Sequence, residues 1–594
     1  MNIEQYYLDL RKHYESIKEE ETLWISMDEL SERLRCTKRN AQLLVHKMVD
    51  QKLIQWVPGK GRGNKSRLLF LRPVSEVILQ KAKQLTLEKK LTEAWELMEQ
   101  YHSKKYDFNE WLSNRFGMKH EGEKDILRYP FYRPILQLDP TFVRRRTEAH
   151  LVRQLFNTLV KYDVSTRLVI PDLAHFWESN ASKDKWRFYL KKGVRFHHGK
   201  ELTSQDIVFT FDRIKKESPF SLIKNVIESA TAIEKYVVDI SLTEPTSLFL
   251  PLICLDSSLI VPSDLEEIDQ KQSFMSYPIG TGPFRVKKND TSELILEAHE
   301  DYFEGRPHLD KIEIWVWPDY EKSFVKGTNE PNDIYFMDYE REHHSLTKLT
   351  NIEQGATFLT FNLQKDGPLQ DQFLRKSIHY GIDRLKMVHE LGGNREMPSN
   401  GFFPIHSKDS FESTFNLSYA KSYLARSNYK GELLSIYTYE MKINEQNGHW
   451  LVKELVHIGI NVQLIVLPIT ELANHRILHK ADMILSGEVF GDQVDLGIIE
   501  MFTFEYGFIN NHLGVDQRRI VTETLEQCKK LDDLGSRNQA LIKLQQQLIE
   551  DNQLIFLYHS NQKLQHDLSV NGVMLNAWGK VDFKNVWIKK SLNL

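Results

Sequence analysis

The stretch from Trp24 to Leu71 reads WISMDELSERLRCTKRNAQLLVHKMVDQKLIQWVPGKGRGNKSRLLFL, and it predicts two short helices followed by a hairpin. Ser26 followed by Glu29 has the pattern of a capping box, in which each side chain satisfies a backbone N–H of the other residue. The helix that it opens is expected to end near Arg35. Thr37 is placed to cap a second helix. This order predicts a helix-turn-helix with a β-hairpin wing.

Each predicted helix has one apolar face. In the first helix the residues on that face are Met27, Leu30 and Leu34. In the second helix the apolar residues recur at i, i+3, i+4 and i+7, the spacing of a buried helix face, and they are Ala41, Leu44, Val45 and Met48. The remaining faces of the second helix carry Lys38, Arg39, Asn40, Gln42, His46 and Lys47.

The polar faces of the second helix predict contacts with DNA. Recognition helices present their N-terminal residues to base edges in the major groove. We therefore expect Arg39, Asn40 and Gln42 to contact bases. Lys38 and Lys47 are expected to contact phosphates, which position a protein on the duplex without reading its sequence.

The hairpin is predicted from two β-like runs, LIQWV at 53–57 and SRLLFL at 66–71, joined by a basic, glycine-rich segment. Glycines in that segment let the backbone approach a partner closely. We expect Lys60, Arg62 and Lys65 to reach DNA phosphates from this wing.

Residues 59–66 also resemble a nucleotide-binding loop, because they read G-x-x-x-x-N-K-S. A phosphate-binding loop of that kind needs glycine at the place held by Asn64, and a helix after its Lys-Ser pair. Neither condition is met, so nucleotide binding is not expected.

Positive charge is concentrated in residues 31–72, which carry eleven lysines and arginines against two acids, in a chain whose net charge is −4. Such a split predicts that one small module meets a polyanion. Double-stranded DNA is favoured over RNA, because the basic stretch offers only Trp56 and Phe70 for stacking on bases. A solvated hairpin on a protein-interaction module is the alternative.

The composition is that of an ordinary soluble globular protein, with 594 residues, 41% hydrophobic and 27% charged. This length predicts about two to four domains. The three cysteines, Cys36, Cys254 and Cys528, are far apart, which fits a reducing compartment and no metal-spaced pair. The N-terminus lacks the apolar run of a signal peptide, and no stretch is long enough to cross a bilayer, so a cytoplasmic protein is expected.

The N-terminal motifs resemble those of the SgrR family of bacterial transcriptional regulators. The similar segments are YYLDLRKHY, LSERLRCTKRNAQLLVHKM and IQWVPGKGRGNKSRLLF, over residues 4 to about 72. Thr37 stands where the family often has serine, and it caps a helix equally well. The resemblance implies a winged helix-turn-helix DNA-binding domain over residues 1–72.

Residues 73–125 are predicted to form a helical connector. Apolar residues in 75–105 follow helical spacing, which predicts two helices packed beside the winged helix. A heptad seam for dimerisation is the alternative.

Residues 126–594 alternate strands with helices, and their motifs resemble the family 5 solute-binding proteins of the oligopeptide- and dipeptide-binding type. The similar segments, in order, include LKKGVRFHHGKELTSQDIVFTF, PIGTGPF, EDYFEGRPHLDKI, LRKSIHYGIDR and IGINVQL. The resemblance implies a two-lobed α/β domain like the type II periplasmic binding proteins. It places the second lobe at about 356–555, and a subdomain of the first lobe at 170–270.

The ligand site is predicted from the same resemblance. In peptide-binding relatives an aspartate of the second lobe holds the ligand's amino group, and here GEVFGDQVDLG offers Asp492 or Asp495. The residues around that aspartate differ from the family pattern, so a peptide, a sugar, a sugar phosphate and a metal chelate all stay open.

No catalytic or metal-binding motif is evident. There is no G-x-S-x-G, and each His-Glu pair lacks the second histidine of a zinc helix. His197 and His198 are interpreted as structural. An enzyme, a cofactor and a bound metal are therefore not expected.

Together these features predict a transcriptional regulator whose solute-binding-like domain senses a small cytosolic ligand and controls DNA binding, at a transporter or metabolic operon. RNA polymerase is a further candidate partner, and the oligomeric state is left open. The alternative is a cytosolic solute-binding protein whose N-terminal module docks a protein partner. A hydrolase acting on the same ligand is a third hypothesis.

Overall fold

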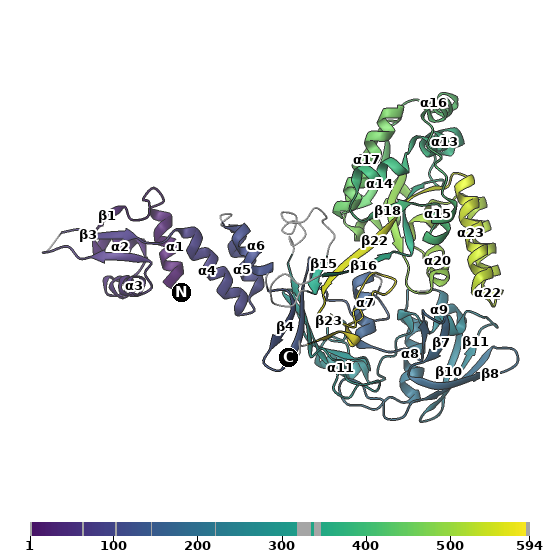
Figure 1. Ribbon diagram of the computed structural model, residues 1–594, viewed down its shortest axis with the longest axis horizontal. Helices are drawn as coiled ribbons and strands as arrows, with labels where there is room; N and C mark the ends of the chain where they lie inside the picture. Colours follow the sequence, from purple (N-terminus) through teal and green to yellow (C-terminus); the bar gives the residue numbers. More distant parts are fainter. Residues whose placement is uncertain are drawn as a thin grey trace. The chain divides into compact units, whose positions relative to one another are not determined.

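The computed structural model describes residues 3–61, 64–100, 104–113, 115–143, 145–219, 221–317, 334–337 and 346–589. The chain divides into two compact units. The first comprises residues 1–116, 130–134 and 315–326, and the second comprises 117–129, 135–314 and 327–594. Figure 1 shows the helices and strands of both units.

The first unit begins with a winged helix-turn-helix, as the sequence predicts. Its elements are α1 (Ile3–His13), β1 (Thr22–Ile25), α2 (Met27–Arg33), α3 (Lys38–Asp50), β2 (Ile54–Val57) and β3 (Ser66–Phe70). The strands form an antiparallel sheet in the order β1-β3-β2. The buried face of α3 is the predicted one, made of Ala41, Leu44, Val45 and Met48.

The two predicted helix caps are formed, with one difference. The Ser26 hydroxyl accepts from the Glu29 N–H at 3.1 Å, and the Thr37 hydroxyl accepts from the Asn40 N–H at 3.3 Å. The Glu29 carboxylate instead accepts from the Tyr14 hydroxyl at 3.1 Å, so the described residues show only the Ser26 half of the predicted capping box.

The helix that Ser26 opens ends at Arg33, slightly earlier than the expected end near Arg35. Arg35 adopts a left-handed backbone with φ of 50°. That conformation turns the chain sharply into α3, because it cannot continue a right-handed helix.

Three helices follow the wing: α4 (Val74–Leu87), α5 (Leu91–Gln100) and α6 (Lys105–Ser113). The two helices expected over 75–105 are α4 and α5. Their apolar residues, Ile78, Ala82, Leu91, Ala94 and Met98, lie in one hydrophobic core that they share with the winged helix. This favours local packing over a dimerisation seam.

The second unit has the predicted two-lobed α/β fold. The sheet of the first lobe has the order β12-β13-β14-β5-β4. Its strands are β4 (Gly117–Glu121), β5 (Lys124–Phe131), β12 (Phe284–Asn289), β13 (Glu293–Ala298) and β14 (Lys311–Val316). The last residues of β5 and β14 belong to the first unit.

The first lobe carries a smaller sheet in the order β10-β11-β9-β8. These strands and the short strands of this part of the chain are β6 (Val160–Asp163), β7 (Leu168–Pro171), β8 (Ala174–Ser179), β9 (Lys185–Leu190), β10 (Ile227–Glu234) and β11 (Val237–Leu242). The helices are α7 (Arg146–Leu155), α8 (Ser204–Glu217), α9 (Ser221–Val226), α10 (Phe249–Leu252) and α11 (Leu265–Lys271). The smaller sheet lies in the subdomain implied for residues 170–270.

The sheet of the second lobe is mixed, with the order β15-β22-β17-β21-β19-β20. β19 runs parallel to β20 and β21, whereas β17 is antiparallel to β21 and β22. The strands are β15 (Ile334–Met337), β16 (Leu346–Ile352), β17 (Gly355–Phe361), β18 (Arg395–Pro398), β19 (Leu434–Tyr439), β20 (Val462–Leu467), β21 (Met483–Val489) and β22 (Leu554–Asp567). A separate antiparallel pair follows near the end of the chain, β23 (Val570–Asn571) and β24 (Trp587–Ile588).

Helices surround that sheet, and α22 packs beside α23 (Figure 1). They are α13 (Gln372–Gly381), α14 (Arg384–Leu391), α15 (Pro404–Ser410), α16 (Leu417–Arg426), α17 (Lys442–Ile458), α18 (Ile469–Leu472), α19 (His475–Lys480), α20 (Val494–Thr503), α21 (Phe508–His512), α22 (Val515–Lys530) and α23 (Leu534–Glu550).

The long strand β22 pairs first with β17 and then, from Asn561 to Asp567, with β16. The link between β16 and β17 runs beside it through Glu353 and Gly355. Gly355 has φ of 136°, and a Cβ there would lie 2.0 Å from the Glu488 carbonyl oxygen, so this crossing requires glycine.

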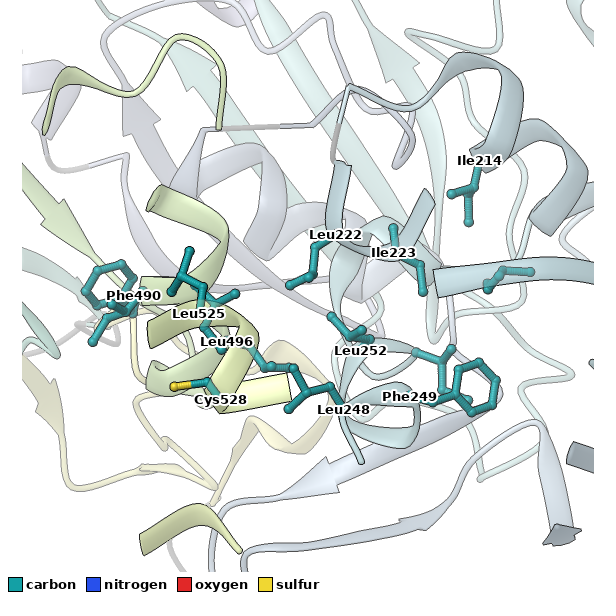
Figure 2. Close-up of a cluster of buried hydrophobic side chains, with 14 of the residues drawn as sticks. Ile214, Leu222, Ile223, Leu248, Phe249, Leu252, Phe490, Leu496, Leu525 and Cys528 are labelled. Carbon is teal, nitrogen blue, oxygen red and sulfur yellow. The ribbon is translucent and has the colours of Figure 1, made fainter. Parts of the chain in front are cut away.

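The largest hydrophobic core joins the subdomain to the second lobe. Figure 2 shows side chains of both, with Leu248 and Leu252 from the subdomain and Leu525 and Cys528 from α22. Hydrogen bonds reinforce the contact: the Thr246 hydroxyl donates to the Lys529 carbonyl at 3.1 Å. We call this contact the apolar joint.

Candidate DNA interface and ligand site

The exposed face of α3 carries most of the predicted DNA-contacting residues. Arg39, Gln42 and Lys47 are exposed, on the side away from the buried stripe. Lys38 is also exposed, and its ammonium pairs with the Asp28 carboxylate of α2. Exposed ion pairs contribute little to stability, so this lysine can exchange Asp28 for a phosphate.

Asn40 lies at the edge of this face rather than at its centre. Its backbone N–H is held by the Thr37 cap, and its side chain hydrogen-bonds Cys36 in the turn before α3. The predicted base contact of Asn40 stays a prediction, as do those of Arg39 and Gln42.

The wing presents Lys60 and Lys65 as exposed side chains. A Cβ at Gly59 would lie 2.7 Å from the carbonyl oxygens of Asn64 and Lys65, so the two arms of the wing approach closely there. Arg62, the third wing residue predicted to contact phosphate, lies outside the described residues.

Sequence reasoning missed one residue of the α3 face. Leu43 is 57% exposed and lies one helical turn after Arg39. It is apolar but falls outside the i, i+3, i+4, i+7 stripe, which is the signal that could have singled it out.

In the second unit, Asp492 lies where the two lobes meet. Arg153 of α7 donates to the Asp492 carboxylate at 3.2 Å and also pairs with Asp256 of the subdomain. The Ala577 N–H donates to Asp492 at 3.3 Å, and the Trp578 ring lies 4.4 Å from the Arg153 guanidinium carbon. Burial opposes the charge of Arg153, but the two carboxylates outweigh it and raise the pKa of the guanidinium.

Asp495, the other predicted ligand aspartate, lies inside the second lobe. Its carboxylate accepts from Arg537 of α23 at 2.8 Å, and the two side chains are 3% and 6% exposed. Arg537 also donates to the carbonyls of Leu531 and Asp532. The pair connects α20 to α23, so the Asp495 carboxylate is engaged within the second lobe.

A second ion pair lies at the lobe junction. Arg146 of α7 pairs with Glu353, which follows β16, and the Gln562 amide of β22 donates to the same carboxylate at 2.5 Å. Lys580 lies within electrostatic range of both partners. Burial lowers the pKa of the Lys580 ammonium to about 8.

Two ionisable groups, Lys580 and Glu488, lie near this pair. In the part of the chain that the structure describes, neither the Lys580 ammonium nor the Glu488 carboxyl makes a hydrogen bond or ion pair. Glu488 is the next-to-last residue of β21 in the second lobe, and burial raises its pKa to about 7. Tyr439 lies within electrostatic range of both Glu488 and Arg146, which places these groups in one region.

Buried polar atoms of α7 complete the site. His150 Nε2 and Gln154 Oε1 lie one turn apart, and both are buried without a hydrogen-bond partner. Burial lowers the pKa of His150 to about 3, so its ring is neutral. Buried polar atoms are normally hydrogen-bonded, so this region has unused capacity for a polar ligand or water.

The paired histidines are held by the protein itself. His197 Nε2 donates to the Gly282 carbonyl at 3.1 Å, and its Nδ1 accepts from the Gly280 N–H at 3.2 Å. His198 pairs with Asp264 at 3.1 Å. Among all the residues whose positions are described, no cluster of three or more His, Cys, Asp or Glu side chains is arranged to hold a metal ion.

These features define a class of protein: a two-lobed solute-binding fold preceded by a winged helix-turn-helix. Residues 169–508 match the model of the bacterial extracellular solute-binding proteins, family 5, middle region. Residues 2–123 match the model of the sugar transport-related sRNA regulator N-terminal domain. The chain belongs to the SgrR family, in which such an N-terminal domain precedes a family 5 solute-binding domain.

Relatives match nearly the whole chain. The uncharacterized protein YhjP of Bacillus subtilis is 31% identical over 579 residues, covering 95% of this chain and 96% of that protein. The HTH-type transcriptional regulator SgrR of Photorhabdus laumondii is 26% identical over 589 residues, covering 98% of each.

Solved structures share the fold of the second unit. A dipeptide-binding protein of Pseudoalteromonas sp. SM9913, in complex with Met-Leu, has a TM-score of 0.65 at 20% identity and covers 78% of this chain and 100% of that one. NikA of Brucella suis, in complex with Fe(III)-EDTA, has a TM-score of 0.65 at 16% identity, with the same coverage of both chains. No helix in the described ranges is long and apolar enough to span a membrane.

Proposed function

We propose that this protein is a cytoplasmic transcriptional regulator that binds double-stranded DNA through α3 and the wing, and that a small solute bound between its lobes controls that binding. The observation that carries the proposal is the exposed, basic face of α3 on a winged helix joined to a solute-binding fold. The full-length similarity to a protein named as an HTH-type transcriptional regulator supports it.

A route for coupling exists within the first unit. Trp317, which follows β14, stacks on Trp95 of α5 with ring centroids 5.4 Å apart, and the Trp95 indole donates to the Val316 carbonyl at 3.3 Å. Trp315 and Trp317 lie in the same core as the winged helix. Since β14 begins in the second unit, a shift of this strand changes the packing on which the winged helix rests.

The ligand contacts that we propose are Glu488 and Lys580, together with Asp492. Glu488 belongs to the second lobe and Lys580 to the C-terminal segment, so a ligand that bonds to both stabilises the state in which the lobes meet. A ligand shifts an equilibrium only by its differential affinity for the two states. Asp492 can bind the ligand when Arg153 releases its carboxylate and pairs with the ligand instead. Asp495 remains paired with Arg537 and is not proposed as a ligand contact.

The solute is one that bonds to a carboxyl group and an ammonium group at once. A peptide, a sugar phosphate, a sugar and a metal chelate stay as candidates. The regulated operon is proposed to encode a transporter or metabolic enzymes. The concentration of the bound solute would then control the genes that import or consume it.

The test is genome-wide crosslinking and sequencing of the tagged protein beside an Arg39→Ala/Lys65→Ala variant. A few sharp peaks that disappear in the variant are expected. Diffuse signal that is indifferent to both substitutions would overturn the DNA-binding proposal.

A second candidate is that the N-terminal module docks a protein, RNA polymerase among the options. Trp24 of β1 and Val57 of β2 are 58% and 46% exposed, and both pair with Arg67 of β3 on one face of the sheet. Trp24→Ala distinguishes the candidates: protein docking predicts loss of co-purifying partners with DNA affinity unchanged.

A further inference from the structure

Leu43 lies at the centre of the face of α3 that points away from the core. Successive residues of a helix are rotated by about 100°, so Leu43 falls opposite the buried stripe, between Arg39 and His46. Its side chain is 57% exposed. The winged helix therefore does not need a leucine at this position for its own packing.

The surroundings of Leu43 favour nucleic acid over a protein partner. Arg39 and Lys47 lie one turn before and one turn after it and are exposed, and Gln42, the residue before it in sequence, is exposed as well. The acid on this face, Asp50, is the last residue of α3, about two turns beyond Leu43. The N-terminal half of the face is thus basic and polar around one apolar side chain.

The major groove offers one apolar group for such a side chain. Base pairs differ there in hydrogen-bond donors and acceptors, and thymine alone presents a C5-methyl group. An apolar side chain flanked by Arg and Gln, which bond to guanine and adenine edges, therefore has one partner of matching chemistry.

We propose that Leu43 contacts the C5-methyl group of a thymine in the operator, and so specifies that base beside the positions read by Arg39 and Gln42. This inference rests on the proposed function, because it requires α3 to lie in the major groove. It adds a specificity-determining residue and states the base that it recognises.

The experiment begins with operator DNA selected in vitro by the full-length protein. Each thymine is then replaced singly by deoxyuridine, which lacks only the methyl group. At one thymine the replacement is expected to weaken wild-type binding about fourfold, the change that follows from one methyl group no longer being buried. Leu43→Ala and Leu43→Gln are each expected to bind the thymine-containing and the deoxyuridine-containing DNA with equal affinity.

Val49→Ala is the matched control, since Val49 is also an exposed apolar residue of α3, 39% exposed, but lies at the helix end. Val49→Ala is expected to lose affinity on deoxyuridine replacement by the same factor as the wild type. An equal deoxyuridine effect in wild-type and Leu43→Ala at every thymine would overturn the inference.

The inference and the proposed function fail differently. If Arg39→Ala loses sequence preference while Leu43→Ala retains the full effect of the methyl group, only the inference is wrong. If the wild-type protein selects no sequence, the proposed function is wrong and the inference falls with it. Thermal unfolding of both Leu43 variants should match the wild type, because the side chain is exposed.

Discussion

Arg153 and Asp492 join the two lobes of the second unit through a hydrogen-bonded ion pair of 3.2 Å. Arg153 also holds Asp256, so one guanidinium connects α7, the subdomain and the loop after β21. Asp492, one of the two aspartates that the family resemblance nominates for the ligand, is thus engaged by the protein itself. Ligand binding at Asp492, as proposed, would compete with the connection between the lobes for one carboxylate.

Arg153→Ala should loosen the lobes without unfolding either one. The substitution leaves Asp492 and Asp256 without their shared cation, and the two carboxylates then favour separation. Small-angle scattering should show a larger radius of gyration than that of the wild type.

The matched control is Arg537→Ala, which breaks a pair inside the second lobe. Removing one partner of a buried ion pair costs about 3–5 kcal/mol, so this variant should lose stability in urea unfolding. If Arg153→Ala left the scattering profile unchanged, the ion pair would not hold the lobes together, and the apolar joint would remain as their link.

Glu488→Gln should change how stability depends on pH. Burial raises the pKa of Glu488 to about 7 in the folded state, above its ordinary value of 4.5. The folded protein therefore holds a proton between about pH 4.5 and 7 that the unfolded chain has lost. The contribution of this carboxyl to stability falls as the pH rises through that window.

Urea unfolding at pH 5 and pH 8 checks this expectation. Between the two pH values the wild type should lose on the order of 1–2 kcal/mol relative to Glu488→Gln, allowing for partial solvent screening. Glu412→Gln, at an exposed glutamate, is the control and should follow the wild type. Parallel pH profiles of the wild type and Glu488→Gln would contradict the raised pKa.

Trp317→Ala should destabilise the first unit, although Trp317 is more than 200 residues from the wing in sequence. Its ring is buried against Trp95 and Phe116, and loss of a buried tryptophan costs about 3–5 kcal/mol. Hydrogen exchange should report faster exchange in α4 and α5. The control is Trp587→Ala, at a ring that is 39% exposed, which should leave those helices protected.

Lys60→Ala and Lys65→Ala should weaken binding to all DNA sequences alike. If each lysine contacts one phosphate, as proposed, each substitution should reduce the slope of log affinity against log salt by about 1. Arg39→Ala should instead relax sequence preference at one position. Binding titrations at several salt concentrations separate the two effects, and equal scaling in all three variants would show that these roles are wrongly assigned.

The winged helix could be predicted from sequence because its signals are local. The Ser26 and Thr37 caps and the stripe from Ala41 to Met48 each depend on residues within a few positions of one another. The reciprocal half of the capping box could not be predicted, because Glu29 bonds instead to Tyr14, which belongs to a different helix.

The proposed ligand site was less predictable for the same physical reason. Glu488 and Lys580 carry no motif, and they lie in β21 and in the segment after β23, so only the tertiary fold relates them. Asp492 and Asp495 look equivalent in sequence, three residues apart. The structure separates them, because one faces α7 and the other faces α23.

The apolar joint between the subdomain and the second lobe has a consequence for temperature. Because it buries leucine, phenylalanine and cysteine side chains, separating the subdomain from the second lobe would expose them to water and increase the heat capacity. Hydrophobic contacts weaken on cooling, so the population with the joint formed should fall as the temperature drops. If the proposed solute acts by bringing the lobes together, temperature should bias the same equilibrium.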